Sequence, residues 1–142
     1  MTTHTIFNTF KRLVFYFVGF FVTAAGITTI LRSTLGAGAW DTVNNNLHEL
    51  TGITLGTASI VINITLLILI MLYHRKRKFI FAFIPIFAIG YFIDLWDANI
   101  YNQFVIETFP MRLLFYLVGT VTLTTGLSLT IVSGYPAMVF DE

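Results

Sequence analysis

Charged residues are scarce in this chain, and cysteine is absent. Only 11% of the 142 residues are Asp, Glu, Lys or Arg, whereas a soluble domain has about 25%. Hydrophobic residues make up 56%, which is more than a small domain can hide in its interior. The lack of cysteine excludes disulfides, thiolate zinc sites and cysteine nucleophiles. A net charge of +1 offers no basic face to nucleic acid. The composition therefore predicts an integral membrane protein.

Four apolar runs are long enough to cross a bilayer. A transmembrane helix needs about 20 mainly apolar residues, at a rise of about 1.5 Å per residue. Pro85 lies inside the third run and removes one backbone donor, which predicts a kink there. The sequence thus predicts an all-α membrane protein with four transmembrane helices. The four runs cover residues 13–31, 57–73, 79–96 and 113–132.

Most of the basic residues fall on one side of the predicted membrane. Lys11 and Arg12 precede the first run, and residues 75–78 fill the turn between the second and third runs. Two crossings separate these groups, so six of the eight Lys and Arg residues share a side. Because cytoplasmic loops carry an excess of Lys and Arg, we expect a multi-pass inner-membrane protein with both termini in the cytoplasm.

Part of the chain repeats at an offset of one hundred residues. Residues 11–42 align without a gap on residues 111–142, and ten positions are identical. Three crossings separate the two copies, so the second copy enters the membrane from the opposite side, as in many secondary transporters. We therefore expect one membrane domain, residues 1–142, with a first repeat over about 11–97 and an incomplete second repeat over 111–142.

A polar stretch separates the first and second apolar runs. Gly36 and Gly38 allow the chain to turn sharply after the first span. Asp41 or Thr42 is expected to cap a short helix that ends at Gly52. This helix is too short and too polar to cross the membrane, and two placements stay open. It lies flat in the interface, or it is a re-entrant segment that faces a wet cavity.

The strongest binding candidates lie in this polar stretch and at the end of the third run. The Trp40–Asp41 pair recurs as Phe140–Asp141, which favours a buried functional role. Asp94 and Asp97 lie on one helical face and either bind a cation or mark the water boundary. Asp94 is the better candidate of the two, because acids inside a membrane usually face a cavity or a partner. The predicted substrate-binding residues are Gly36, Gly38, Trp40, Asp41, Asn44 and Asp94.

No recognisable enzyme signature is present. The sequence has no nucleophile–His–acid motif, no phosphate-binding glycine loop before a Lys, and no His-Glu-x-x-His. The three histidines lack the spacing of metal ligands, so neither a metal nor a cofactor is expected. Gly19 and Gly26, repeated as Gly119 and Gly126, favour close helix packing.

The LGAGAWD run, followed by an amphipathic stretch that closes on TGITLGTAS, resembles the YczE/YyaS/YitT-type bacterial membrane proteins. The resemblance covers nearly the whole chain and implies a membrane location and a transport role without naming a substrate. Members of that family have additional spans, so this chain is expected to be a natural short form or a truncated product of a longer gene. The matching positions are Gly36, Gly38, Trp40, Asp41, Leu47, Thr51, Gly52, Gly56, Gly90 and Asp94.

Two functions are consistent with these features. The first is a transporter-like protein that passes a small solute or ion. The second is a non-transporting membrane scaffold or regulatory subunit. The lipid bilayer is the expected environment in both. Because the incomplete second repeat leaves polar groups uncovered, we also expect a homo-oligomer or another membrane subunit as a partner.

Overall fold

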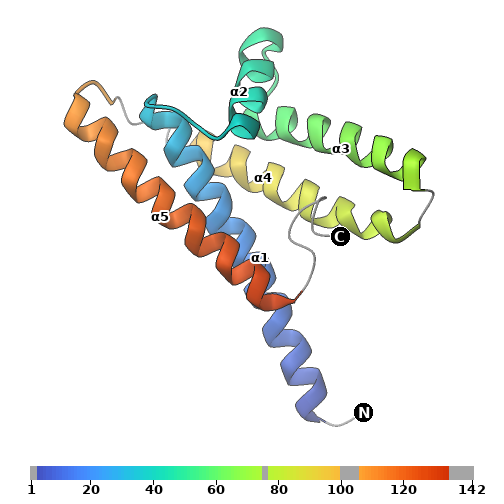
Figure 1. The fold of residues 1–142 in the computed structure, drawn as a ribbon. Helices are drawn as coiled ribbons and strands as arrows, with labels where there is room; N and C mark the ends of the chain where they lie inside the picture. Colours follow the sequence, from blue (N-terminus) through green and yellow to red (C-terminus); the bar gives the residue numbers. More distant parts are fainter. Residues whose placement is uncertain (1–2, 75–76, 100–105, 135–142) are drawn as a thin grey trace.

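The computed structural model describes residues 3–74, 77–99 and 106–134 (Figure 1). All regular structure in these ranges is helical, and a short helix follows the first long one. Within these ranges, four stretches are long and apolar enough to cross a membrane: Asn8–Ser33, Leu55–Tyr73, Ile80–Asn99 and Phe109–Ser133. The prediction of an all-α membrane protein with four spans is confirmed. The elements are α1 (Thr3–Ser33), α2 (Ala39–Thr51), α3 (Leu55–His74), the 3-10 helix η1 (Arg77–Ala82), α4 (Phe83–Asn99) and α5 (Phe109–Ser133).

Helices α1 and α5 lie side by side and run antiparallel (Figure 1). Their backbones meet at glycines on both sides. A Cβ added at Gly26 would lie 2.6 Å from the Cα atom of Leu123, and one added at Gly126 would lie 2.8 Å from the Cα atom of Thr23. Only a residue without a side chain permits this approach, and such approaches drive helix association in membranes. The predicted packing surface of Gly19, Gly26, Gly119 and Gly126 is therefore present, and it is the contact between α1 and α5 of the same chain.

The ends of these two helices are built alike. Ser33 donates its hydroxyl to the carbonyl of Ile30, and Ser133 donates to the carbonyl of Thr130. The next residue is left-handed in each case, with φ of 56° at Thr34 and 73° at Gly134. Its N–H bonds the carbonyl three residues back. These are the local C-terminal bonds that satisfy the last carbonyls of a helix.

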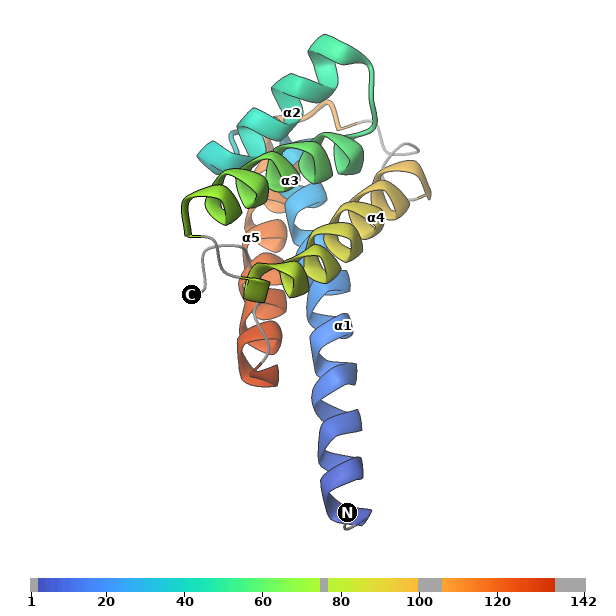
Figure 2. The ribbon, with the colours of Figure 1, turned by 90° about the vertical axis from the view of Figure 1, so that its right-hand side faces the viewer.

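Helices α3 and α4 form a second antiparallel pair, which is inclined to the α1–α5 pair (Figure 2). Gly56 and Gly90 let the two backbones cross, since a Cβ at Gly90 would lie 2.9 Å from the carbonyl oxygen of Gly56. A cluster of Leu67, Ala82 and Ile86 closes the other end of the pair.

Helix α4 also packs on α1 and so joins the two pairs. Ala24, Leu55 and Ile93 form the buried cluster at this junction. The indole N–H of Trp96 donates to the carbonyl of Phe21 at 3.2 Å. As a result α1 is covered on two sides. Inside the protein, 56% of the most apolar part of α1 is buried, compared with 17% for α5.

Two local expectations differ from the structure. Pro85 does not kink a continuous helix, because the chain changes from 3-10 to α-helix at Phe83. Pro85 then lies in the first turn of α4, where a missing N–H breaks no helical hydrogen bond. The expected cap of α2 at Asp41 or Thr42 is wrong: the helix starts at Ala39, and Gly38 precedes it without a side-chain cap.

Candidate functional site

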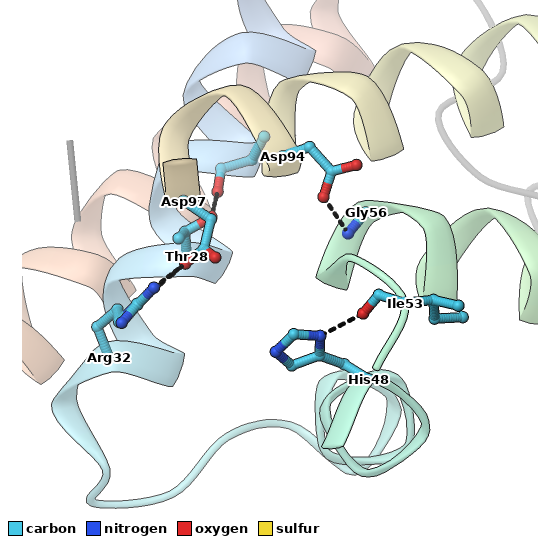
Figure 3. A network of polar contacts seen from close by, with 8 residues as sticks. Thr28, Arg32, His48, Ile53, Gly56, Asp94 and Asp97 are labelled. Carbon is cyan, nitrogen blue, oxygen red and sulfur yellow. Dashed lines mark hydrogen bonds and ion pairs between the residues drawn. The ribbon is translucent and has the colours of Figure 1, made fainter. Parts of the chain in front are cut away.

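Polar side chains gather where the ends of α1 and α4, the start of α3 and the end of α2 come together (Figure 3). We call this region the polar end and define it by Arg32, His48, Thr54, Asp94 and Asp97. The contacts of Asp94 and Asp97 join residues that are 38 to 65 positions apart in the chain. Because the end of α1, the start of α3 and the end of α4 meet here, α3 runs in the opposite direction to α1 and α4.

Asp94 fixes the start of α3. One carboxylate oxygen accepts the N–H of Gly56 at 2.7 Å, and the other accepts the hydroxyl of Thr54 at 2.7 Å. The Thr54 oxygen in turn accepts the N–H of Thr57 at 3.2 Å. These bonds satisfy donors of the first turn that have no partner inside the helix. They also set a negative charge at the positive end of the helix dipole.

Arg32 pairs with the second acid of α4. Its Nη2 and Nε atoms lie 2.6 Å and 2.9 Å from one oxygen of Asp97. The two side chains are 36% and 26% exposed, and they tie the end of α1 to the end of α4. Asp94 and Asp97 thus have different partners. Among the described residues no group of three or more His, Asp or Glu side chains could hold a metal ion.

Helix α2 turns polar residues toward the rest of the chain. Asn44 is only 4% exposed, and its Oδ1 atom has no hydrogen-bond partner among the described residues. Burial also raises the pKa of the Asp41 carboxyl, since the charged form loses solvation. His48 contacts the carbonyl of Ile53 through its Nδ1 atom. The helix ends as expected at Gly52, which is left-handed with φ of 71°.

The predicted site residues are divided between two places. Gly38 and Asp41 are close, because a Cβ at Gly38 would lie 3.3 Å from the Oδ2 atom of Asp41. Asn44 is one turn further along α2. Gly36 lies in the link before α2 with φ of 138°. Trp40 is 40% exposed.

Asp94 lies on α4 and binds the start of α3, and no hydrogen bond or ion pair joins it to Asp41 in the described part of the chain. The repeat partners Phe140 and Asp141 lie outside the described residues, as do the side chains of residues 75–78.

Two important residues were not predicted as part of a site. Thr54 was available from the sequence, since a Thr before an apolar run is a typical helix start. Arg32 is one of the two Lys and Arg residues that do not belong to the six on the shared side. Its partner is 65 positions away, and no local pattern indicates such a pair.

The comparisons with known proteins agree with the resemblance noted in the sequence. A family model described as a family of unknown function (DUF6198) matches residues 10–142, and the chain belongs to this family. It is 24% identical to YyaS of Bacillus subtilis (strain 168) over 131 residues, which are 92% of this chain and 65% of YyaS. It is 28% identical to the membrane protein YczE of the same organism over 127 residues, which are 89% of this chain and 58% of YczE.

The chain thus spans less than two thirds of the length of these curated relatives. No solved structure matches it. Together with the four apolar helices, the relationship to YczE identifies a multi-pass membrane protein in a lipid bilayer.

Proposed function

We propose that the protein passes a small solute or ion across the membrane, and that the inner face of α2 contributes to the path. The observation that carries this proposal is the buried amide of Asn44, whose oxygen has no partner in the described residues. A buried polar group left without a hydrogen bond costs about 1–3 kcal/mol. Such an unpaired buried group needs an explanation, and a water molecule, ion or solute that passes beside α2 would supply its missing hydrogen bond.

Asp41 is the second residue of the proposed path. It precedes Asn44 by three positions and therefore lies on a neighbouring part of the same helical face. Burial raises its pKa, so its carboxyl exchanges protons closer to neutral pH than an exposed acid does. Gly36 and Gly38 supply backbone freedom before the helix. Trp40 borders the proposed path in the first turn of α2, and Asp94 holds the start of α3 beside α2.

A partial inverted repeat, residues 11–42 and 111–142, is part of the same proposal. Its support is that the contacts between α1 and α5 come in pairs offset by one hundred residues. A Cβ at Gly19 would lie 2.9 Å from the nitrogen of Thr130, and a Cβ at Gly119 would lie 2.9 Å from the nitrogen of Ile30. Gly26 with Leu123 and Gly126 with Thr23 form the second such pair. A two-fold axis in the membrane plane relates inverted repeats of transporters in this way.

Flux in reconstituted vesicles tests the proposal. Proteoliposomes would be diluted into isosmotic glycerol, urea, glycine, NaCl and KCl, with swelling followed by light scattering and internal pH by a trapped dye. We expect wild type to pass at least one of these probes, and Asp41→Asn and Asn44→Ala to lose that flux while inserting normally. Glu49→Gln is the matched control, because it removes an acid from an exposed position of α2. Equal flux in wild type and Asp41→Asn would contradict the proposal.

The competing function is a membrane scaffold or regulatory subunit that transports nothing. The exposure of α5 favours it, because several large apolar side chains of this helix have little cover from the rest of the chain. A second copy or another membrane subunit would then cover α5. Absence of flux for every probe, together with chemical cross-links between α5 helices in native membranes, would establish this alternative.

The orientation with both termini in the cytoplasm also belongs to the proposal, and a reporter fused at Lys76 that signals from the periplasm would overturn it.

A further inference from the structure

Helix α2 carries an apolar stripe that does not point into the protein. Trp40, Val43, Leu47 and Leu50 follow one another at spacings of three and four residues, so they share one side of the helix. Val43 is 50% exposed and Leu50 is 85% exposed, while Leu47 is half-buried. In an ordinary surface helix the apolar side covers the core. Here the side chains that turn inward are Asn44 and His48.

The remaining side of α2 is polar and exposed. Thr42, Asn46 and Glu49 are all open to the surroundings. At 3.6 residues per turn, these residues lie on the opposite side from the inward-facing Asn44, and the apolar stripe lies between the two. The helix thus has three faces: one against the protein, one apolar and one polar. A helix that lies at the edge of a bundle in the membrane surface needs this pattern.

The position of α2 along the chain keeps it at the end of the membrane spans. The first span ends at Ser33, six residues before α2 begins, and the second span begins at Leu55, four residues after α2 ends. Figure 2 shows α2 beside α3, at the end of α1 that is opposite to the N-terminus. The short links at both ends therefore keep α2 close to the ends of the first and second spans.

We propose that α2 is an interfacial helix whose apolar stripe is embedded in the bilayer surface, with lipid as the occupant. The Thr42–Asn46–Glu49 side then faces water, and the Asn44–His48 side rests on the bundle. A tryptophan in the first turn fits this placement, because indole rings favour the boundary between headgroups and acyl chains. This placement selects the flat helix over the re-entrant segment. It is independent of any transport function.

Neighbouring residues on different faces of α2 provide the test. The chain has no cysteine, so Leu50→Cys and Glu49→Cys each give a single site for a nitroxide label in reconstituted vesicles. We expect the label at residue 50 to be relaxed by oxygen, which concentrates in lipid. The label at residue 49 should be relaxed by a water-soluble nickel chelate. Equal access of the chelate to both sites would overturn the proposal.

Tryptophan fluorescence provides a second measurement with a milder substitution. The chain has two tryptophans, so Trp96→Phe isolates Trp40 and Trp40→Phe isolates Trp96. Lipids brominated near the top of the acyl chain should reduce Trp40 fluorescence more than lipids brominated near its end. Stronger quenching by the deep bromines would establish a re-entrant segment instead. Protection from bromine and from aqueous acrylamide together would mean that a second protein copy covers the stripe, and this would also overturn the proposal.

Discussion

Replacing Asp94 with Ala is expected to loosen the junction of α3 and α4 strongly. The carboxylate accepts two hydrogen bonds, from the Gly56 N–H and from the Thr54 hydroxyl, both at 2.7 Å. A hydrogen bond to a charged group contributes about 1.5–3 kcal/mol. The Gly56 N–H would also lie in the first turn of a membrane helix without a partner. Allowing for partial compensation by water at the helix end, we expect a loss of about 2–4 kcal/mol in the free energy of unfolding.

The measurement is reversible unfolding in mixed micelles of dodecyl maltoside and SDS, followed by circular dichroism. Asp97→Ala is the matched control, because it removes an acid one turn further along α4. Its ion pair with Arg32 is partly exposed, and exposed pairs contribute only about 0–1 kcal/mol. A double-mutant cycle that combines Asp94→Ala with Thr54→Val should give a coupling energy different from zero, since the two side chains share a hydrogen bond. Equal effects of Asp94→Ala and Asp97→Ala would refute the reasoning.

Three further outcomes are expected. Gly126→Ala should lower the free energy of unfolding by about 1–3 kcal/mol, because the new Cβ overlaps the backbone of Thr23 and overpacking has a cost of this size. An unchanged unfolding midpoint would contradict the packing of α1 on α5. Thr34→Gly should raise the free energy of unfolding by up to about 1 kcal/mol, since Thr34 has a left-handed backbone and this conformation strains residues with a Cβ. A lower unfolding midpoint in the variant would contradict this prediction. Burial raises the pKa of Asp41, so its stabilising contribution is full below the ordinary carboxyl pKa and is lost as pH rises through the raised value. The stability of wild type relative to Asp41→Asn should therefore fall as pH rises, and parallel pH profiles of the two proteins would argue against a buried carboxyl.

The sequence predicted the class of the fold because lipid leaves few choices. A chain with four long apolar runs must satisfy its backbone hydrogen bonds within each run, and helices do this locally. The short polar helix and its end at Gly52 were also predictable, because glycine takes the left-handed conformation that ends a helix. The glycines at positions 19, 26, 119 and 126 indicated close helix packing for the same local reason, namely the absence of a side chain.

Only the tertiary structure decided what the polar residues do. Asp94 was predicted as a substrate-binding residue, and the fold shows that this side chain of α4 binds the N–H of Gly56 at the start of α3, 38 positions earlier in the chain. Asp97 was expected beside it as a cation ligand or at the water boundary, and the fold gives it Arg32. The start of α2 was misplaced because Gly38 precedes the helix where Asp41 or Thr42 was expected to cap it.

The orientation of α2 shows the same limit. Its sequence contains both an apolar stripe and a polar side, and in a soluble protein the apolar stripe would face the core. The fold instead turns Asn44 inward and leaves Leu50 exposed. Periodicity along a helix determines which residues share a face. Which face meets the protein depends on contacts with α3 and on the solvent around the bundle, and neither of these is encoded in the local sequence.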